Sequence, residues 1–245
     1  MPFTISHAAA LIPLKRWNVK VSTTAFVVGS VVPDFENFLL LRHTDKFAHT
    51  LPGVFLFDFP AALFFCFAFH LLLKSLVIDI LPNYYRSRLE PYRNFNWPEF
   101  CYENVVLVIR SIFMGIVIHM FLDGFTHDHG IFIQALPILR YNIPWLDHKP
   151  VFFILQIILS FLGIVLLQWY VSKMPSLPVV NRCASVRYDI YLLPILAFFV
   201  LMVRVLVNPY YNSTTDLLKA CIGAFIYAVF IVSIRRHIIK KKYIW

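Results

Sequence analysis

The run LPGVFLFDFPAALFFCFAFHLLL, residues 51–73, contains one carboxylate, Asp58, and neither lysine nor arginine. About 20 consecutive apolar residues are needed for an α-helix to cross a lipid bilayer. Thr50 and Pro52 are typical of a helix start, with Thr50 as the N-cap and the proline in the first turn. The sequence therefore predicts a membrane-spanning helix that begins at about residue 51.

Four further runs approach the same length and apolar character: residues 104–122, 151–171, 191–207 and 217–234. The whole chain of 245 residues is 60% hydrophobic and 14% charged. Soluble domains have about 45–50% apolar and about 25% charged residues, so this composition excludes a soluble enzyme, a disordered protein and a disulfide scaffold. We predict an all-α, polytopic integral membrane protein with about five transmembrane helices.

The apolar segment 23–41 is interrupted by Pro33, Asp34, Glu36 and Asn37, so it predicts interfacial or re-entrant helices instead of a sixth span. We expect a single membrane domain over residues 1–245. Residues 1–50 would supply N-terminal interfacial helices that carry candidate ligands. Residues 51–130 would hold the first two spans, and residues 131–245 three more spans and a basic tail.

The basic residues lie between the apolar runs, which is how membrane proteins set their orientation. They form no aromatic-interleaved patch, so the net charge of +9 points to the lipid bilayer as a partner and not to nucleic acid. Residues 74–103, residues 172–190 and the tail carry twelve lysines and arginines, and the opposite segments carry seven. The positive-inside rule then places the tail in the cytoplasm and residues 1–50 outside.

His119, Asp123 and His127, in HMFLDGFTHDHG, follow each other at intervals of four residues at the outer end of the second span. On a continuous helix they lie within about 80° of arc, because each residue turns about 100°. An imidazole and a carboxylate one turn apart can ligate one metal ion, as in the HExxH motif. The alternative is a polar helix end with solvated histidines.

The N-terminal part adds His7, Asp34, Glu36 and His49. Each has an ordinary structural interpretation when taken alone, as a surface, turn or cap residue. His49, however, lies at the outer end of the first span. Because consecutive spans are antiparallel, the outer end of the second span, with His119 and Asp123, should lie next to it. Charged groups at a membrane boundary are costly unless they are paired or bound to metal. Imidazole and carboxylate ligands suit zinc, with manganese or iron as alternatives.

Asp58 and Arg110 are the charged residues that we expect to pair inside the membrane. Asp58 is nine residues beyond His49, and Arg110 is nine residues before His119 on an antiparallel helix. At 1.5 Å per residue, both lie about 14 Å below these histidines. An unpaired charge at such depth costs about 2.5–3.5 kcal/mol or more, which favours a pair.

Four segments, MPFTISHAAA, GSVVPDFENF, FAHTLPGVFLFDFPAALFFCFAFH and HMFLDGFTHDHG, together resemble the bacterial membrane family called domain of unknown function 4184. That family is distantly similar to membrane-bound metal-dependent hydrolases and, more remotely, to zinc-dependent phospholipase C. The resemblance implies that five positions are inherited as site residues, with Glu36 and His127 secondary: His7, Asp34, His49, His119 and Asp123. In the phospholipase pattern, His127 or His129 would be the later histidine.

We therefore expect a membrane-embedded hydrolase that depends on a divalent metal and acts on a lipid or lipid-linked phosphate ester from the outer side. Asp34, Glu36 and Asp123 are the candidate catalytic carboxylates. Two alternatives stay open: a non-catalytic transporter, assembly factor or scaffold, and a purely structural metal site. A cluster at the mouth of the spans favours hydrolysis, whereas one at mid-membrane favours transport.

Overall fold

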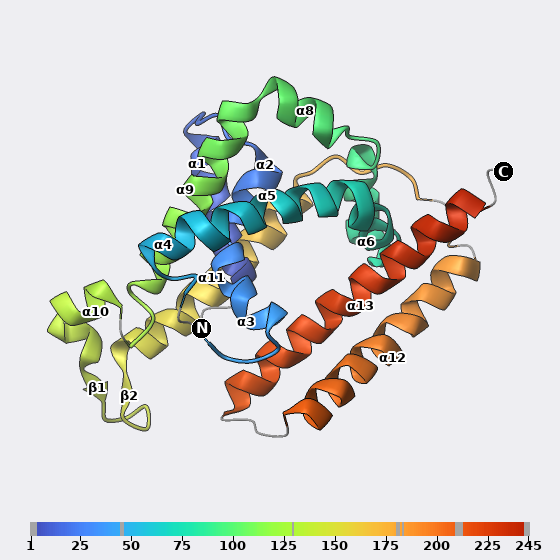
Figure 1. Ribbon diagram of the computed structural model, residues 1–245. Helices are drawn as coiled ribbons and strands as arrows, with labels where there is room; N and C mark the ends of the chain where they lie inside the picture. Colours follow the sequence, from blue (N-terminus) through green and yellow to red (C-terminus); the bar gives the residue numbers. More distant parts are fainter. Residues whose placement is uncertain are drawn as a thin grey trace. The chain divides into compact units, whose positions relative to one another are not determined.

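The computed structural model describes residues 4–44, 47–128, 130–179, 182, 184–208 and 213–242. Apart from the short antiparallel pair β1 (Asn142–Ile143) and β2 (Lys149–Pro150), the regular elements in these residues are helices (Figure 1). Five helical segments among them are long and apolar enough to cross a membrane. The prediction of an all-α polytopic membrane protein is confirmed.

The five segments are Leu51–Ile80, Val105–Asp123, Val151–Ser172, Ser185–Val207 and Thr214–Lys240. The first consists of α4 (Leu51–Gly53), η3 (Val54–Asp58), α5 (Phe59–Ala68), η4 (Phe69–Leu73) and α6 (Lys74–Ile80). Of these, η3 and η4 are π-helical turns. The other four are α9 (Val105–Asp123), α11 (Val151–Ser172), α12 (Ala184–Val207) and α13 (Thr214–Lys242).

The first and fourth of these helices extend past the apolar runs that predicted them, because their charged residues have partners. Lys74 Nζ donates to the backbone oxygen of Phe95 at 2.8 Å. Asp79 accepts a hydrogen bond from Arg93 at 2.8 Å, and Asp189 accepts one from Arg235 at 2.8 Å. The hydropathy pattern ends each predicted span at its charged residues. The helix itself continues through them because each charge has a partner.

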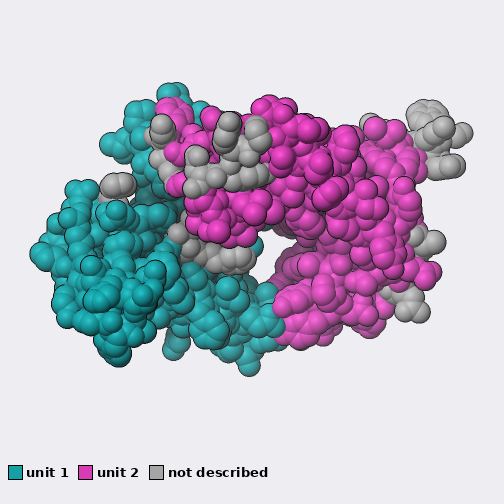
Figure 2. All heavy atoms as spheres, turned by 90° about the horizontal axis from the view of Figure 1, so that it is seen from below, with its two compact units in different colours: residues 1–33, 48–63, 101–173 teal, residues 34–47, 64–100, 174–245 magenta. Residues whose placement is uncertain are grey.

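The contacts divide the chain into two compact units, each made of three separate stretches (Figure 2). Unit 1 contains residues 1–33, 48–63 and 101–173, and unit 2 contains residues 34–47, 64–100 and 174–245. Each unit is therefore built from both chain halves. The single membrane domain that the sequence suggests stays a prediction.

In unit 1 the N-terminal segment forms η1 (Thr4–Ala10), α1 (Leu11–Arg16) and α2 (Thr23–Gly29), and it packs against α9 and α11. Glycines allow backbone to meet backbone at both contacts. A Cβ built on Gly115 of α9 would lie 2.5 Å from the Phe26 oxygen, and one on Gly163 of α11 would lie 2.6 Å from the Ser6 Cβ. Within the predicted interfacial or re-entrant segment 23–41, α2 is thus a short element packed on α9, and its position relative to the membrane stays a prediction. The unit continues with α10 (Ile131–Ala135) and η6 (Pro137–Arg140).

Unit 2 pairs α12 with α13 and adds the second half of the first apolar segment. Its apolar core contains Leu76, Leu193, Ala228, Val229 and Val232. Short helices complete it: α3 (Phe35–Leu39), α7 (Asn83–Leu89), η5 (Glu90–Tyr92) and the start of α8 (Trp97–Glu103). The Arg236 guanidinium joins two carboxylates, those of Asp79 and Asp189, so an ionic network links α6, α12 and α13.

Asp58 and Arg110 both belong to unit 1. Arg110 donates to the backbone oxygen of Lys20 at 2.7 Å, and Asp58 is fully buried at the end of η3. A guanidinium has five N–H donors, so the bond to Lys20 leaves others available. The intramembrane pair of Asp58 with Arg110 stays a prediction.

Thr50 caps the first apolar segment as the sequence indicates: its Oγ1 accepts a hydrogen bond from the Gly53 N–H at 3.1 Å, and Pro52 lies in the first turn. Removing such a cap costs about 0.5–2 kcal/mol. We expect Thr50→Ala to lower the free energy of unfolding by about 1 kcal/mol in thermal unfolding of the solubilised protein. Thr50→Ser keeps the hydroxyl and should be neutral; equal losses in both variants would contradict a capping role.

Candidate metal centre

Four histidines reach the same point of unit 1 from three separate stretches of chain. His119 and Asp123 occupy the last turn of α9, and His127 follows in the turn that ends it. His49 immediately precedes the N-cap residue Thr50. His7 comes from η1, which Gly163 allows to lie against α11.

All four imidazoles surround the Asp123 carboxylate. His7 Nε2 lies 3.2 Å from Asp123 Oδ1. The nitrogens on the Oδ2 side are His119 Nε2 at 3.3 Å, His49 Nε2 at 3.4 Å and His127 Nδ1 at 3.5 Å. The rings also lie against one another: the centroids of His7 and His119 are 4.4 Å apart, and those of His49 and His119 are 5.5 Å apart. We call this group the His–Asp123 cluster.

Backbone carbonyls fix the tautomers of the two most buried rings. His119 Nδ1 lies 2.9 Å from the Ser30 oxygen, and His7 Nδ1 lies 3.0 Å from the Thr4 oxygen. A carbonyl oxygen only accepts hydrogen bonds, so each Nδ1 carries a proton, and in the neutral form of either ring the Nε2 lone pair would face Asp123. Metal-binding histidines in proteins characteristically donate their other N–H to a carbonyl or carboxylate.

Nitrogen lone pairs and a carboxylate repel one another unless a cation lies among them. His7 Nε2 and Asp123 Oδ1 are both buried and lie 3.2 Å from each other. The Asp123 carboxylate by itself can balance only one protonated imidazole among the four. A divalent cation satisfies every acceptor at once, and ligand atoms held at about 2.0–2.1 Å around tetrahedral zinc lie about 3.3 Å from one another. The observed separations of 3.2–3.5 Å fit that spacing.

The cluster is closed on one side and open on the other. The side chains of His7 and His119 are 1% and 0% exposed, whereas those of His49 and His127 are 24% and 33% exposed. Solvent and a substrate can therefore approach from the side of His49 and His127. A catalytic zinc site keeps such an open position, and a structural site fills all four with protein ligands.

Asp34 and Glu36 are predicted site residues that belong to the other unit. Asp34 is buried and begins the first stretch of unit 2, directly after Pro33. Glu36 also belongs to unit 2, where its carboxylate accepts a hydrogen bond from the Phe47 N–H at 3.3 Å. The roles of Asp34 and Glu36 as ligand or base stay predictions. His129 lies outside the described residues.

The sequence interpretation missed the groups that hold the ligands. The backbone carbonyls of Ser30 and Thr4 cannot be recognised from the sequence, because every residue has a carbonyl. The glycines, in contrast, can be recognised. The chain has only 7, and Gly29, Gly115 and Gly163 all lie at close contacts between helices of unit 1. Their rarity is the signal that could have located the packing of η1 and α2.

Comparison with known proteins adds one match. The family model described as a domain of unknown function (DUF4184) matches residues 1–240, nearly the whole chain. Neither the curated proteins nor the solved structures contain a match.

Proposed function

We propose that this chain, which belongs to the DUF4184 family, is a membrane-embedded, metal-dependent hydrolase of a phosphate ester. The observation that carries the proposal is the group of four imidazoles around the carboxylate of Asp123, with two of the rings held by backbone carbonyls. The metal would be zinc, with manganese and iron as alternatives that the same nitrogen and oxygen ligands accept.

Three of the four groups His7, His49, His119 and Asp123 would hold the ion, which leaves a position for water, and His127 would lie at the open edge. A bound divalent ion would polarise a phosphoryl oxygen and lower the pKa of a coordinated water to about 7. Hydrolysis then adds the water oxygen to phosphorus, breaks the ester P–O bond and returns a proton to the leaving alcohol. Asp123 presents two oxygens, so one can ligate while the other accepts the proton of the attacking water.

The position of the cluster favours hydrolysis over transport. His49 precedes the first apolar helix, and His119 and Asp123 lie at the end of the second, so the ligands gather where apolar helices begin and end. Transporter sites in contrast lie near the bilayer midplane. Together with the distribution of lysine and arginine, this supports a site at the outer face of the membrane, which the resemblance to a bacterial family suggests is a bacterial inner membrane.

The test is hydrolysis of bis(p-nitrophenyl) phosphate and of phospholipid vesicles by the purified protein. We expect activity that is abolished by a chelator and restored by zinc or manganese. His119→Asn should lower it by more than about 100-fold, because loss of a ligand exceeds the 10–100-fold loss typical of its supporting partners. His148→Asn alters an exposed histidine outside the cluster and is the matched control.

Two results would contradict the proposal. If the protein binds metal but hydrolyses neither substrate, the metal site is structural and the proposed hydrolase activity is wrong. Hydrolysis that persists in His119→Asn would place the reaction elsewhere in the chain.

A further inference from the structure

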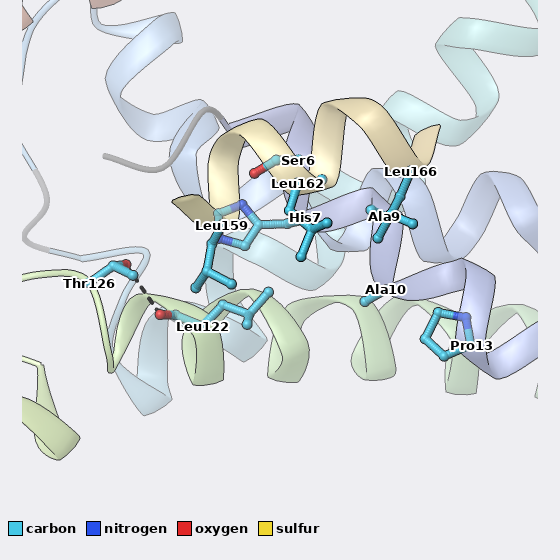
Figure 3. A pocket seen from close by; sticks show the side chains of 11 residues that line it. Ser6, His7, Ala9, Ala10, Pro13, Leu122, Thr126, Leu159, Leu162 and Leu166 are labelled. Atoms are coloured by element: carbon cyan, nitrogen blue, oxygen red, sulfur yellow. Dashed lines mark hydrogen bonds between the residues drawn. The ribbon is translucent and has the colours of Figure 1, made fainter. Parts of the chain in front are cut away.

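A pocket of about 160 Å³ lies in unit 1 beside the His–Asp123 cluster (Figure 3). Its walls come from η1 and α1 on one side, the end of α9 on another, and α11 on the third. The pocket exists because Gly163 brings η1 against α11 at Ser6, while the larger side chains one turn away on α11 keep the elements apart.

The lining is almost entirely hydrocarbon. Leu122 comes from α9, and Leu159, Leu162 and Leu166 follow one face of α11, as the labelled side chains in Figure 3 show. Neither lysine nor arginine lines it. The Thr126 hydroxyl at its edge is already used, since it donates to the Leu122 oxygen at 3.2 Å. An apolar cavity of about 150 Å³ stays dry and accepts hydrocarbon.

The pocket opens toward the outer face of α11. Leu162 is 48% exposed, and its neighbours Phe161 and Val165 are exposed as well. α11 is one of the helices apolar enough to cross a membrane, so this face meets lipid tails and not water. A chain from the bilayer can therefore enter the pocket sideways.

His7 joins the pocket to the cluster. Its imidazole lines the pocket, and its Nε2 lies 3.2 Å from Asp123 Oδ1. A molecule with a hydrocarbon chain in the pocket would thus carry its polar end to the histidines. Apart from His7, the polar side chains of the lining are Ser6 and Thr126, both uncharged, so the pocket offers no charged partner for a second polar end.

We propose that this pocket receives the hydrocarbon chain of the substrate, so that the phosphate ester cleaved at the cluster belongs to a lipid and not to a water-soluble metabolite. The inference rests on the proposed function and deepens it. It assigns residues that position the hydrocarbon chain, chiefly Leu159, Leu162 and Leu166. These residues contact no atom of the reacting phosphate.

The test uses a photoreactive lipid, a lysophosphatidic acid with a diazirine at the end of its acyl chain, added to the protein in nanodiscs. We expect cross-links at Ala10 and Pro13, which line the pocket from η1 and α1. Leu166→Trp fills the pocket and should reduce them by more than tenfold. Val165→Trp adds the same bulk to the neighbouring exposed position and should leave them unchanged.

The outcomes separate the pocket from the reaction. Equal cross-linking at Ala10 and Pro13 in both tryptophan variants, or none in the wild type, would overturn the pocket as a chain site even if the protein hydrolyses phosphate esters. Cross-links that depend on Leu166, in a protein without metal or hydrolysis, would keep the pocket as a hydrocarbon site and overturn its assignment to a substrate. In an active protein, Leu166→Trp should raise the KM for phospholipid and leave that for bis(p-nitrophenyl) phosphate unchanged.

Discussion

Asp123→Asn will remove the bound metal and lower phosphate-ester hydrolysis by more than about 100-fold, a larger loss than supporting residues cause. The asparagine keeps the shape of the side chain and loses the negative charge of Asp123, which faces four imidazoles. Its neutral amide is a weak ligand, and its N–H₂ would point donors at the nitrogens that the metal needs. Metal content by plasma emission spectroscopy and the hydrolysis rate both report the change.

Asp128→Asn is the matched control for Asp123→Asn. The same substitution is made five residues later, on an exposed carboxylate in the loop after α9. Metal content and activity should then equal those of the wild type. If Asp123→Asn retains its metal, or if both variants lose it equally, the cluster is not the metal site.

Gly115→Ala will weaken metal binding by about 10–100-fold although Gly115 has no side chain that could touch the ligands. A Cβ at this position would lie 2.6 Å from the Ser30 nitrogen and 2.5 Å from the Phe26 oxygen, so the end of α2 must move away from α9. The carbonyl of Ser30 fixes the ring of His119, and its displacement frees that ring to turn. Such overpacking also costs about 1–3 kcal/mol of stability.

Zinc titration of the folded variant, followed by competition with a chelator, measures this loss. Val117→Ala lies on an exposed face of the same helix and should leave zinc affinity unchanged. Wild-type affinity in a folded Gly115→Ala protein would show that the hydrogen bond between Ser30 and His119 does not hold the metal ligand in place.

Much of the fold was predictable because a bilayer imposes a length and an apolar composition on each span. The helices α9 and α11 match the predicted 104–122 and 151–171 within a residue or two. The first apolar segment instead runs on to Ile80, because Lys74 and Asp79 find partners on distant stretches of chain. The π-helical turn at Val54–Asp58 is equally invisible to a hydropathy pattern.

The candidate site was predictable to the extent that it is local. One helical turn fixes the relation of His119 to Asp123, and consecutive spans suggest that of His49. His7 is 112 residues before His119, and only the close contacts at Gly115 and Gly163 bring its segment to the cluster. The apolar pocket beside His7 depends on these tertiary contacts, so the spacing of residues along the sequence does not predict it.

Metal analysis of the wild-type protein, purified from the membrane without chelators, tests the central claim most directly. The account predicts about one zinc or manganese ion per chain, removed by a chelator and rebound on addition of either ion. It also predicts that a His7→Asn, His119→Asn double variant, inserted in the membrane like the wild type, contains none. Wild-type protein that purifies without metal and binds neither added zinc nor manganese would contradict it.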